Sequence, residues 1–310
     1  MSQLSITELH ERQRWPLNQK IDHACGAIEA FTAHCKEYDY SPYVSFSGGM
    51  NSTVLLDIVR RYVAQDMKGV FCSTGNEYPE IIQFVRQTRN VETIHPEMTP
   101  REVLMHYGFP LVSKEQAQAV RQIRTTCSEK LRNLRLYGSE GRHAGMLSKR
   151  WRYLVQEPYM VSERCCDILK KRPFHKYNRK NRSLPMLGTM ASESRLREMA
   201  YMRKGGCNVF TADPSKVRSA PLSIWMAEDC RAYIHRFGVP YASIYDVAGV
   251  LRTGCMCCGF GAQFSSDRRF EMLYERHPRI YQMIMEYTNN GCSYRGALQR
   301  MGVRLPDEYN

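Results

Sequence analysis

The sequence lacks any apolar run approaching the roughly 20 residues that a membrane-spanning helix needs. Its N-terminal stretch, MSQLSITELHERQRW, is too polar for a secretion signal, so we expect a cytoplasmic protein without a membrane partner. Acidic residues are in deficit, with 31 Asp and Glu against 44 Lys and Arg. The formal net charge of +13 favours polyanionic partners such as nucleotides or nucleic acid, without choosing between them.

Cysteine is plentiful, but a reducing cytoplasm disfavours disulfides, and a chain of 310 residues can bury a large core without them. The scattered cysteines are expected to be small buried apolar residues: Cys25, Cys35, Cys72, Cys127, Cys207, Cys230 and Cys292. Two segments are clustered instead, Cys165-Cys166 and Cys255-Met256-Cys257-Cys258. Adjacent cysteines do not easily bond to each other, whereas a Cys-x-x-Cys turn brings two thiolates to one metal centre. The two segments are therefore candidate metal ligands.

The most informative stretch runs from Tyr43 to Arg61 and predicts a strand, a glycine turn and a helix. A β-branched and aromatic run stops at Ser47-Gly48-Gly49, and an apolar helical pattern follows from Ser52. The first amides of such a helix lack internal partners and lie at the positive end of its dipole, which suits a phosphate. The two glycines let an anion approach the backbone, and nearby hydroxyl groups add donors. A plain turn between strand and helix is the alternative.

The run Ser47-Gly48-Gly49-Met50-Asn51-Ser52 resembles the SGGxDS loop of the ATP pyrophosphatases, or adenine nucleotide alpha hydrolases. This superfamily includes the phosphoadenosine phosphosulfate (PAPS) reductase family. The run is not a Walker loop, because no Gly-Lys-Ser/Thr closes it. The resemblance implies that the loop holds the pyrophosphate of ATP and Mg²⁺ during attack on the α-phosphate, with Asn51 and Ser52 as catalytic residues. Asn51 replaces the family's Asp, which keeps a carbonyl ligand but loses the charge that helps to hold Mg²⁺.

Further segments extend the resemblance from about Tyr43 to Arg304. Residues 73–80 are similar to DTGxExPE, residues 108–115 to YGxPxxSKE, and residues 221–246 to PLxxW…D…YI…PYxxxYD, which we interpret mainly as packing residues. Arg195 would meet the phosphate charge as a catalytic residue. The implied residues that bind ATP or a related adenine nucleotide are Ser45, Phe46, Ser47, Gly48, Gly49, Asn51, Ser52, Thr74, Gly75, Gly188 and Thr189.

The alternation of predicted strands and helices indicates an α/β fold with a doubly wound, mainly parallel sheet and helices on both faces. Because ligands collect at the carboxyl ends of such strands, the Ser47 and Thr74 loops are expected to converge on one crevice. The predicted segments are a helical lead-in at 1–41 against the sheet edge, a nucleotide-binding domain at 42–250 with a basic insertion or lid at 133–182, and a helical cysteine-bearing region at 251–310.

The resemblance also bears on the clustered cysteines. A Cys-Cys pair with a distant Cys-x-x-Cys binds a 4Fe-4S cluster in assimilatory adenylylsulfate reductases, which implies Cys165, Cys166, Cys255 and Cys258 as ligands. Arg164 and Lys170 would offset the charge of that cluster. Zn²⁺ suits four thiolates equally well in chemical terms, free thiols are a third interpretation, and Cys257 is an alternative ligand to Cys258.

Three functions follow from the resemblance. The first is an adenylating, ATP pyrophosphatase-type enzyme that transfers sulfur from a donor protein to DNA or RNA, which the basic segments 121–152 and 164–182 would contact. Those segments could equally neutralise the nucleotide alone. The second is an adenylylsulfate or PAPS reductase, against which the retained SGG loop and the missing C-terminal Glu-Cys-Gly-x-His segment count. The third is a catalytically weakened accessory of a phage or CRISPR-type defence system, silenced by Asn51.

Overall fold

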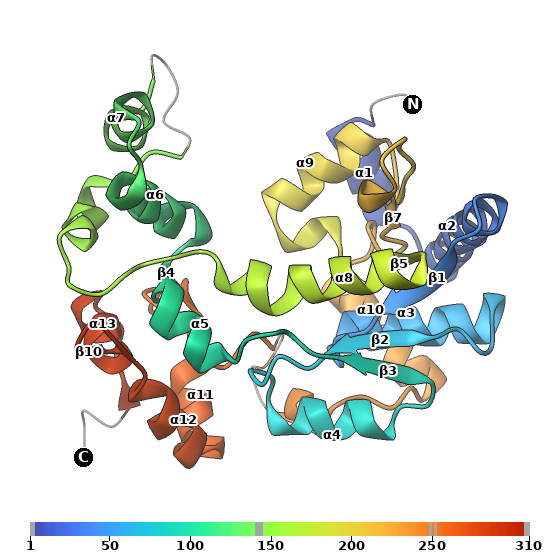
Figure 1. Cartoon of the computed structure of the whole chain (residues 1–310). Coiled ribbons are helices and arrows are strands. Elements are labelled where there is room, and N and C mark those ends of the chain that lie inside the picture. The colour runs from blue at the N-terminus through green and yellow to red at the C-terminus, as the bar shows by residue number, and fades with distance from the viewer. Residues whose placement is uncertain (1–3, 140–144, 248–249, 251–252, 307–310) are drawn as a thin grey trace. The chain divides into compact units, whose positions relative to one another are not determined.

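The computed structural model describes residues 4–139, 145–247, 250 and 253–306 (Figure 1). The backbone falls into two compact units whose segments interleave along the sequence. Unit 1 comprises Met1–Ser73, Tyr78–His95 and Pro173–Thr253, and unit 2 comprises Thr74–Glu77, Pro96–Arg172 and Gly254–Asn310. The division into consecutive segments at 1–41, 42–250 and 251–310 stays a prediction. No helix among the described residues is both long enough and apolar enough to cross a membrane.

Unit 1 is built on a six-stranded sheet in the order β3-β2-β1-β5-β7-β6. Each neighbouring pair is parallel except β6 and β7, which confirms the predicted mainly parallel α/β fold. β1 lies inside the sheet and pairs with β5 along its whole length. The strands are β1 (Ser41–Ser45), β2 (Gly69–Cys72), β3 (Val91–Ile94), β5 (Ser183–Leu187), β6 (Asn208–Val209) and β7 (Arg218–Ser219).

Helices cover both faces of this sheet (Figure 1). Tyr43 of β1 packs against Tyr177 of α8, with ring centroids 5.4 Å apart. Phe46, just after β1, lies 6.0 Å from Phe84 of α4, and it points to the opposite face because side chains alternate along an extended strand. The helices of this unit are α1 (Ile6–Gln13), α2 (Leu17–Glu37), α3 (Met50–Ile58), α4 (Pro79–Gln87), α8 (Arg172–Asn181), α9 (Arg195–Lys204) and α10 (Ala227–Phe237).

The long helix α2 lies within the predicted helical lead-in at 1–41. It packs on β1 and β7, and its Ala27 carbonyl accepts a hydrogen bond at 2.8 Å from the side chain of Asn208 in the edge strand β6. Its buried face repeats every three or four residues through Ile21, Ala24, Ile28, Phe31 and Cys35. Lys20 on the same helix is only 2% exposed, and its ammonium lies 2.5 Å from the carboxylate of Asp229 on α10. That ion pair compensates a charge that would otherwise be costly to bury.

Unit 2 is mainly helical, with two small pairs of strands. β4 and β8 are parallel, and β9 and β10 form an antiparallel hairpin. α11, α12 and α13 confirm a helical C-terminal region. The elements are α5 (Pro100–Tyr107), β4 (Leu111–Val112), α6 (Lys114–Thr125), α7 (Glu129–Tyr137), β8 (Gly259–Phe260), α11 (Arg269–Arg276), α12 (Pro278–Met285), β9 (Thr288–Asn289), β10 (Cys292–Ser293) and α13 (Tyr294–Arg300).

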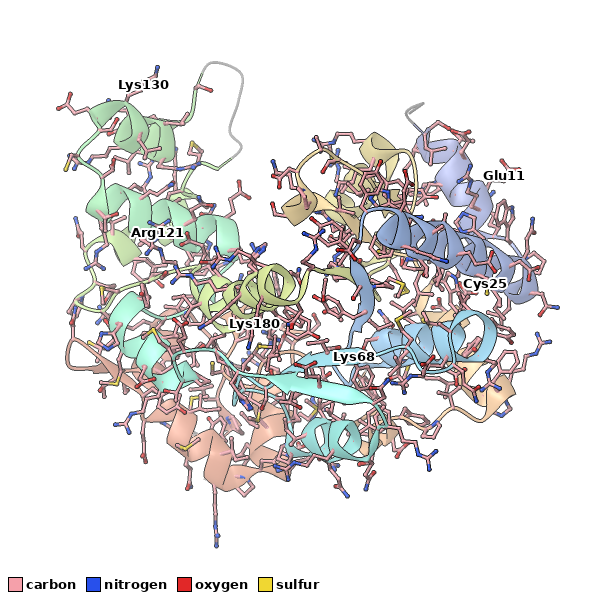
Figure 2. All side chains as sticks on the ribbon, turned by 45° about the vertical axis from the view of Figure 1, so that its right-hand side comes forward. Glu11, Cys25, Lys68, Arg121, Lys130 and Lys180 are labelled. Carbon is pink, nitrogen blue, oxygen red and sulfur yellow. The ribbon has the colours of Figure 1, made fainter. Side chains whose placement is uncertain are left out.

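Two separate helices, α6 and α7, follow β4. Thr126 ends α6 in an extended conformation, and the Ser128 hydroxyl accepts a hydrogen bond from the Leu131 amide and so starts α7. Cys127, in this break, is exposed, contrary to the expectation that it is buried. Figure 2 labels Arg121 on α6 and Lys130 on α7. The first part of the predicted insertion at 133–182 contains the end of α7 and a 3₁₀ turn, Lys149–Val155, while residues 140–144 lie outside the described residues.

Candidate functional site

The predicted phosphate loop is a tight turn between β1 and α3 in unit 1. Gly48 has a φ of +69°, a left-handed conformation that glycine adopts without a steric penalty. A Cβ at this position would lie 2.8 Å from a methyl group of Ile81 and 2.9 Å from one of Val85, both on α4. The turn is therefore packed directly on the helix that follows β2, and only glycine fits there.

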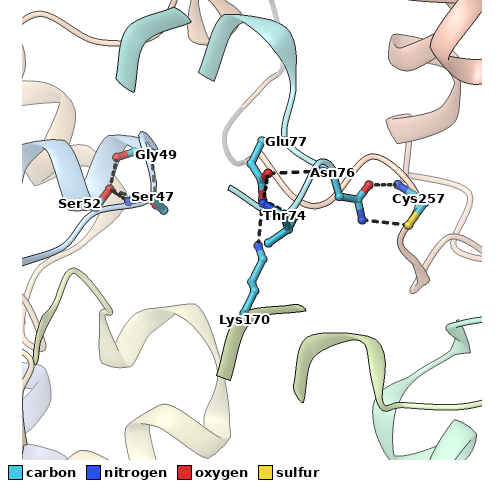
Figure 3. A network of polar contacts seen from close by, with 8 residues as sticks. All are labelled: Ser47, Gly49, Ser52, Thr74, Asn76, Glu77, Lys170 and Cys257. Atoms are coloured by element: carbon cyan, nitrogen blue, oxygen red, sulfur yellow. Dashed lines mark hydrogen bonds and ion pairs between the residues drawn. The ribbon is translucent and has the colours of Figure 1, made fainter. Parts of the chain in front are cut away.

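The hydroxyl of Ser52 holds this turn together (Figure 3). It donates a hydrogen bond to the Gly49 carbonyl at 2.9 Å, accepts one from the Ser47 amide at 3.1 Å, and lies 3.0 Å from the Ser47 hydroxyl. The Thr53 hydroxyl donates to the same Gly49 carbonyl at 3.0 Å. The hydroxyl groups that the sequence suggested as phosphate donors thus stabilise the turn itself.

The first amides of α3 are largely unsatisfied. Gly49 provides no side-chain cap, and the amide of Met50 donates to the Tyr245 hydroxyl at 3.3 Å. The amides of Asn51 and Ser52 have no hydrogen-bond acceptor in the described part of the chain. Gly188, after β5, contacts the start of α3 closely. A Cβ at Gly188 would lie 2.9 Å from both the backbone oxygen of Asn51 and the backbone nitrogen of Ser52. The structure therefore brings Gly188 to the loop.

The remaining residues predicted in unit 1 have different settings. Ser45 ends β1, and Phe46 is 1% exposed, so an approaching ligand could meet little more than its backbone. Thr189 follows Gly188 directly. Arg195 is exposed in the first turn of α9, and its side chain has no partner among the residues that the structure describes. Its contact with a phosphate stays a prediction, as does the catalytic role of Asn51.

Thr74 and Gly75 belong to unit 2, and their convergence with the loop of unit 1 stays a prediction. The Thr74 amide donates to one carboxylate oxygen of Glu77 at 3.0 Å, and its hydroxyl donates to the other at 2.7 Å. The ammonium of Lys170 lies 3.9 Å from the same carboxylate (Figure 3). Gly75 has a φ of +78°, which allows this tight turn.

The same turn is hydrogen-bonded to the cysteine segment through Asn76 (Figure 3). The Asn76 side-chain amide donates to the thiol of Cys257 at 2.9 Å, and the Cys257 amide donates to the Asn76 side-chain oxygen at 2.9 Å. The Asn76 carbonyl accepts from Met256, also at 2.9 Å. The hydroxyl of Tyr294 donates to the Cys257 carbonyl at 2.9 Å. Cys257 is thus buried and hydrogen-bonded at its backbone and its thiol. An N–H···S bond is compatible with ligation, so the choice of Cys258 over Cys257 as a ligand stays a prediction.

The four predicted ligand thiols lie within unit 2 and interact electrostatically with one another. A hydrogen bond from Cys165, together with the charge of Lys114, lowers the pKa of Cys166 to about 5. That hydrogen bond, burial and the thiols of Cys166, Cys257 and Cys258 raise the pKa of Cys165. Burial raises the pKa of Cys255 and of Cys258, although nearby cations oppose the rise.

Local packing explains how these cysteines are held. Cys165 lies beside the buried pair Ile168 and Leu169, which packs on Val103 of α5. The Cys258 amide donates to the Cys255 carbonyl at 3.0 Å, which closes the Cys-x-x-Cys turn immediately before β8. The guanidinium of Arg269 donates to the Cys258 carbonyl at 2.7 Å. Despite burial, the anionic groups of Cys255 and Glu77 hold the pKa of Lys170 above its ordinary value.

No three Cys, His, Asp or Glu side chains converge to hold a single metal ion anywhere in the described ranges. The donor set is nevertheless chemically suited to iron and sulfide, because thiolates are the usual ligands of iron–sulfur clusters. Three cations lie near the thiols and would offset a cluster's negative charge: Lys114, Lys170 and Arg269. Arg164, which was expected to share this role, stacks over the Tyr107 ring at 5.7 Å.

Sequence reasoning missed several residues of these two sites. Asn76 stands inside a segment assigned to the nucleotide, and the pattern alone gave no sign of its bonds to Cys257. Lys114 and Arg269 are ordinary surface residues by type, while Tyr294 belongs to an apolar helix face. Tyr245 is the second tyrosine of the PYxxxYD pattern and was interpreted as a packing residue. Its polar tip was the available signal, because a tyrosine hydroxyl that is partly buried usually has a partner.

A known domain family and several known proteins are similar to this chain. The phosphoadenosine phosphosulfate reductase domain matches residues 41–138 and 113–260. Two uncharacterized proteins of Methanocaldococcus jannaschii are 23% identical over 251 residues and 24% identical over 258 residues. These matches cover 80% and 82% of this chain, but only 43% and 49% of the two relatives. The chain thus spans less than half the length of each of them.

A solved phosphoadenylyl-sulfate (PAPS) reductase from Candida auris, in a phosphate complex, is 14% identical and has a TM-score of 0.40. The match covers 73% of this chain and 89% of that one. On the extent of the domain match, the chain belongs to the phosphoadenosine phosphosulfate reductase domain family.

The contact of Gly188 with the loop is testable by adding one methyl group. Gly188→Ala places a Cβ 2.9 Å from the backbone of Asn51 and Ser52, so the loop must shift. We expect pyrophosphate affinity, measured by calorimetry, to fall at least about tenfold. Gly26→Ala in α2 is the control, since a Cβ there meets nothing within 4 Å and should stabilise by about 0.5–1 kcal/mol. Unchanged affinity in Gly188→Ala would contradict the described contact.

Proposed function

We propose that the loop of unit 1 binds ATP or a related adenine nucleotide and that the protein adenylates an acceptor with release of pyrophosphate. The observation that carries this proposal is the pair of unsatisfied amides at the start of α3, in a turn held by Ser52 and closed by Gly188. Such amides, at the positive end of a nine-residue helix, favour phosphate oxygens. Arg195 and Thr189 are proposed to meet the same nucleotide.

Asn51 is the residue on which turnover depends in this proposal. Its side chain is half-buried and has no partner among the described residues, so its carbonyl oxygen is free to face a ligand. A neutral amide can coordinate Mg²⁺ but adds no negative charge to the site. Mg²⁺ is therefore proposed to be held weakly here, mainly by the nucleotide's own phosphates.

Restoring a carboxylate tests this assignment. Asn51→Asp is expected to raise Mg²⁺-dependent exchange of pyrophosphate into ATP at least about tenfold, because an ionised ligand holds the metal more strongly. Asn18→Asp, on the exposed surface of α2, adds the same charge elsewhere in unit 1 and should leave exchange unchanged. If ATP binds while Asn51→Asp shows no exchange with any acceptor, the catalytic proposal fails and a nucleotide-binding accessory is favoured.

We further propose that Cys165, Cys166, Cys255 and Cys258 hold a 4Fe-4S cluster, which would supply redox or sulfur chemistry when bound. The support is the mutual electrostatic interaction of these thiols and the three cations beside them. A sulfur-donor protein is then a proposed partner. A second candidate function, reduction of adenylylsulfate or PAPS, is favoured by the same thiols and by the family, and sulfite release from adenylylsulfate would reveal it.

Iron and sulfide analysis after anaerobic purification tests the ligand set. Cys258→Ser is expected to lose most of the iron, because it removes one of four thiolates. Cys257→Ala should keep the iron if Cys258 is the fourth ligand, and its loss of iron would assign that role to Cys257 instead. Cys292→Ser, in β10, is the matched control with the same substitution. If the wild-type protein contains stoichiometric zinc and no iron, the cluster proposal fails and the thiols form a zinc site.

DNA or RNA is the proposed acceptor, contacted by the surface formed by α7 and the turn Lys149–Val155. α7 buries none of its residues, and Tyr137 is 66% exposed. The guanidinium of Arg150 lies 4.6 Å from the centroid of the Trp151 ring. Exposed cations on this surface can contact phosphates while an aromatic ring stacks on a base. The exposed basic residues are Lys130, Arg132, Lys149 and Arg150.

Charge reversal on this surface tests the nucleic-acid proposal. Lys130→Glu and Arg150→Glu are each expected to weaken binding and to lower the slope of log affinity against log salt concentration by about 1. Lys36→Glu, at the end of α2, changes the net charge equally and should have little effect. Equal losses in all three variants would show that overall charge, and not this surface, governs binding.

A further inference from the structure

Tyr245 contributes a polar side chain to the N-terminal end of α3 from a distant part of the sequence. Its hydroxyl accepts a hydrogen bond from the Met50 amide at 3.3 Å and lies 2.9 Å from the hydroxyl of Thr253. A Cβ on Gly49 would come within 3.3 Å of the same hydroxyl. Met50 is the first residue of α3, so the tyrosine oxygen lies where an anion at the helix N-terminus would also bind.

The tyrosine is held in this position from its own side of the fold. It lies on a 3₁₀ turn, Ser243–Asp246, where its amide donates to the Ala242 carbonyl at 3.1 Å. Ile244 of the same turn is fully buried, and the turn packs on α4, the helix under Gly48. The backbone of Tyr245 is therefore fixed, and only its ring and hydroxyl need to adjust to a ligand.

We propose that the Tyr245 hydroxyl caps α3 in the nucleotide-free protein and that a phosphate oxygen displaces it, so Tyr245 sets the affinity of the loop for phosphate. A neutral hydrogen bond of 3.3 Å is longer than the usual 2.9–3.0 Å. A charge-assisted hydrogen bond to phosphate is roughly twice as strong, so the Met50 amide bonds to the anion in preference to the tyrosine hydroxyl. Part of the binding free energy of the anion then compensates for the lost hydrogen bond between the Met50 amide and the Tyr245 hydroxyl.

The proposal rests on the proposed nucleotide-binding function. It predicts that removing the Tyr245 hydroxyl strengthens phosphate binding, whereas removing a group that contacts the ligand would weaken it. Tyr245→Phe removes the hydroxyl and leaves the ring, so the Met50 amide is free before the anion arrives. We expect inorganic pyrophosphate to bind the full chain about threefold to tenfold more tightly, the range that one net hydrogen bond supplies. Tyr241→Phe is the matched control, because that hydroxyl donates to Asp246 and not to the loop.

Thermal unfolding adds a readout that a direct phosphate contact would not produce. Without ligand, Tyr245→Phe should melt below the wild type, because α3 has lost its cap. With saturating pyrophosphate the difference should close, because the wild type has given up the same bond. Thr253→Val keeps Tyr245 but removes the Thr253 hydroxyl, its second hydrogen-bond partner. This variant should bind pyrophosphate more tightly than the wild type, by a smaller factor than Tyr245→Phe.

The outcomes separate this inference from the proposed function. If the wild type binds pyrophosphate and Tyr245→Phe binds equally or more weakly, the hydroxyl is not a displaced cap and the inference is overturned. If Tyr245→Phe does not fold, Thr253→Val decides: pyrophosphate binding that is unchanged or weaker in that variant overturns the inference. If no variant and not even the wild type binds pyrophosphate, the loop is no phosphate site, and both proposals fail together.

Discussion

The hydrogen bonds of one serine hydroxyl shape the candidate nucleotide site. Ser52 ties the Ser47 amide to the Gly49 carbonyl, so the chain leaves β1 and enters α3 in a single tight turn. The left-handed Gly48 packs on α4, and Gly188 meets the turn from β5. Three elements that are distant in sequence thereby hold the amides of α3 in fixed directions, which is the preorganisation that anion recognition requires.

A comparable constraint organises unit 2. Asn76 pairs with the backbone and the thiol of Cys257, and this pairing anchors the Cys-x-x-Cys turn to the turn of Thr74 and Glu77. Each polar atom of the asparagine side chain is used, so the pairing leaves no unsatisfied group behind. The remaining thiols are half-buried beside cations, and among them the pKa of Cys166 is the one that is lowered toward the thiolate.

Much of the fold could be predicted because local periodicity and tertiary packing agree. The strand before Ser47 and the helix after it carry their own signals, and the parallel sheet follows from the alternation of strands and helices. The break between α6 and α7 has a local cause, because the Ser128 hydroxyl caps α7 by accepting a hydrogen bond from the Leu131 amide three residues later.

For the candidate sites, residue types identified the glycine loop and the clustered thiols, since few other roles explain those patterns. The partners of those residues could not be predicted, because hydrogen bonds such as Met50 to Tyr245 join positions that lie far apart in the sequence. No local pattern encodes which tyrosine of a packing motif turns its hydroxyl toward a helix end. Such pairings depend on side-chain directions that only the assembled fold defines.

The interleaving of the two units has an evolutionary and practical consequence. Because the chain crosses between them at Ser73, Glu77, His95, Arg172 and Thr253, neither unit is one contiguous stretch of sequence. Recombination at a single point cannot transplant one unit without splitting the other. No single cut in the chain therefore leaves both unit 1 with its glycine loop and unit 2 with its cysteines whole.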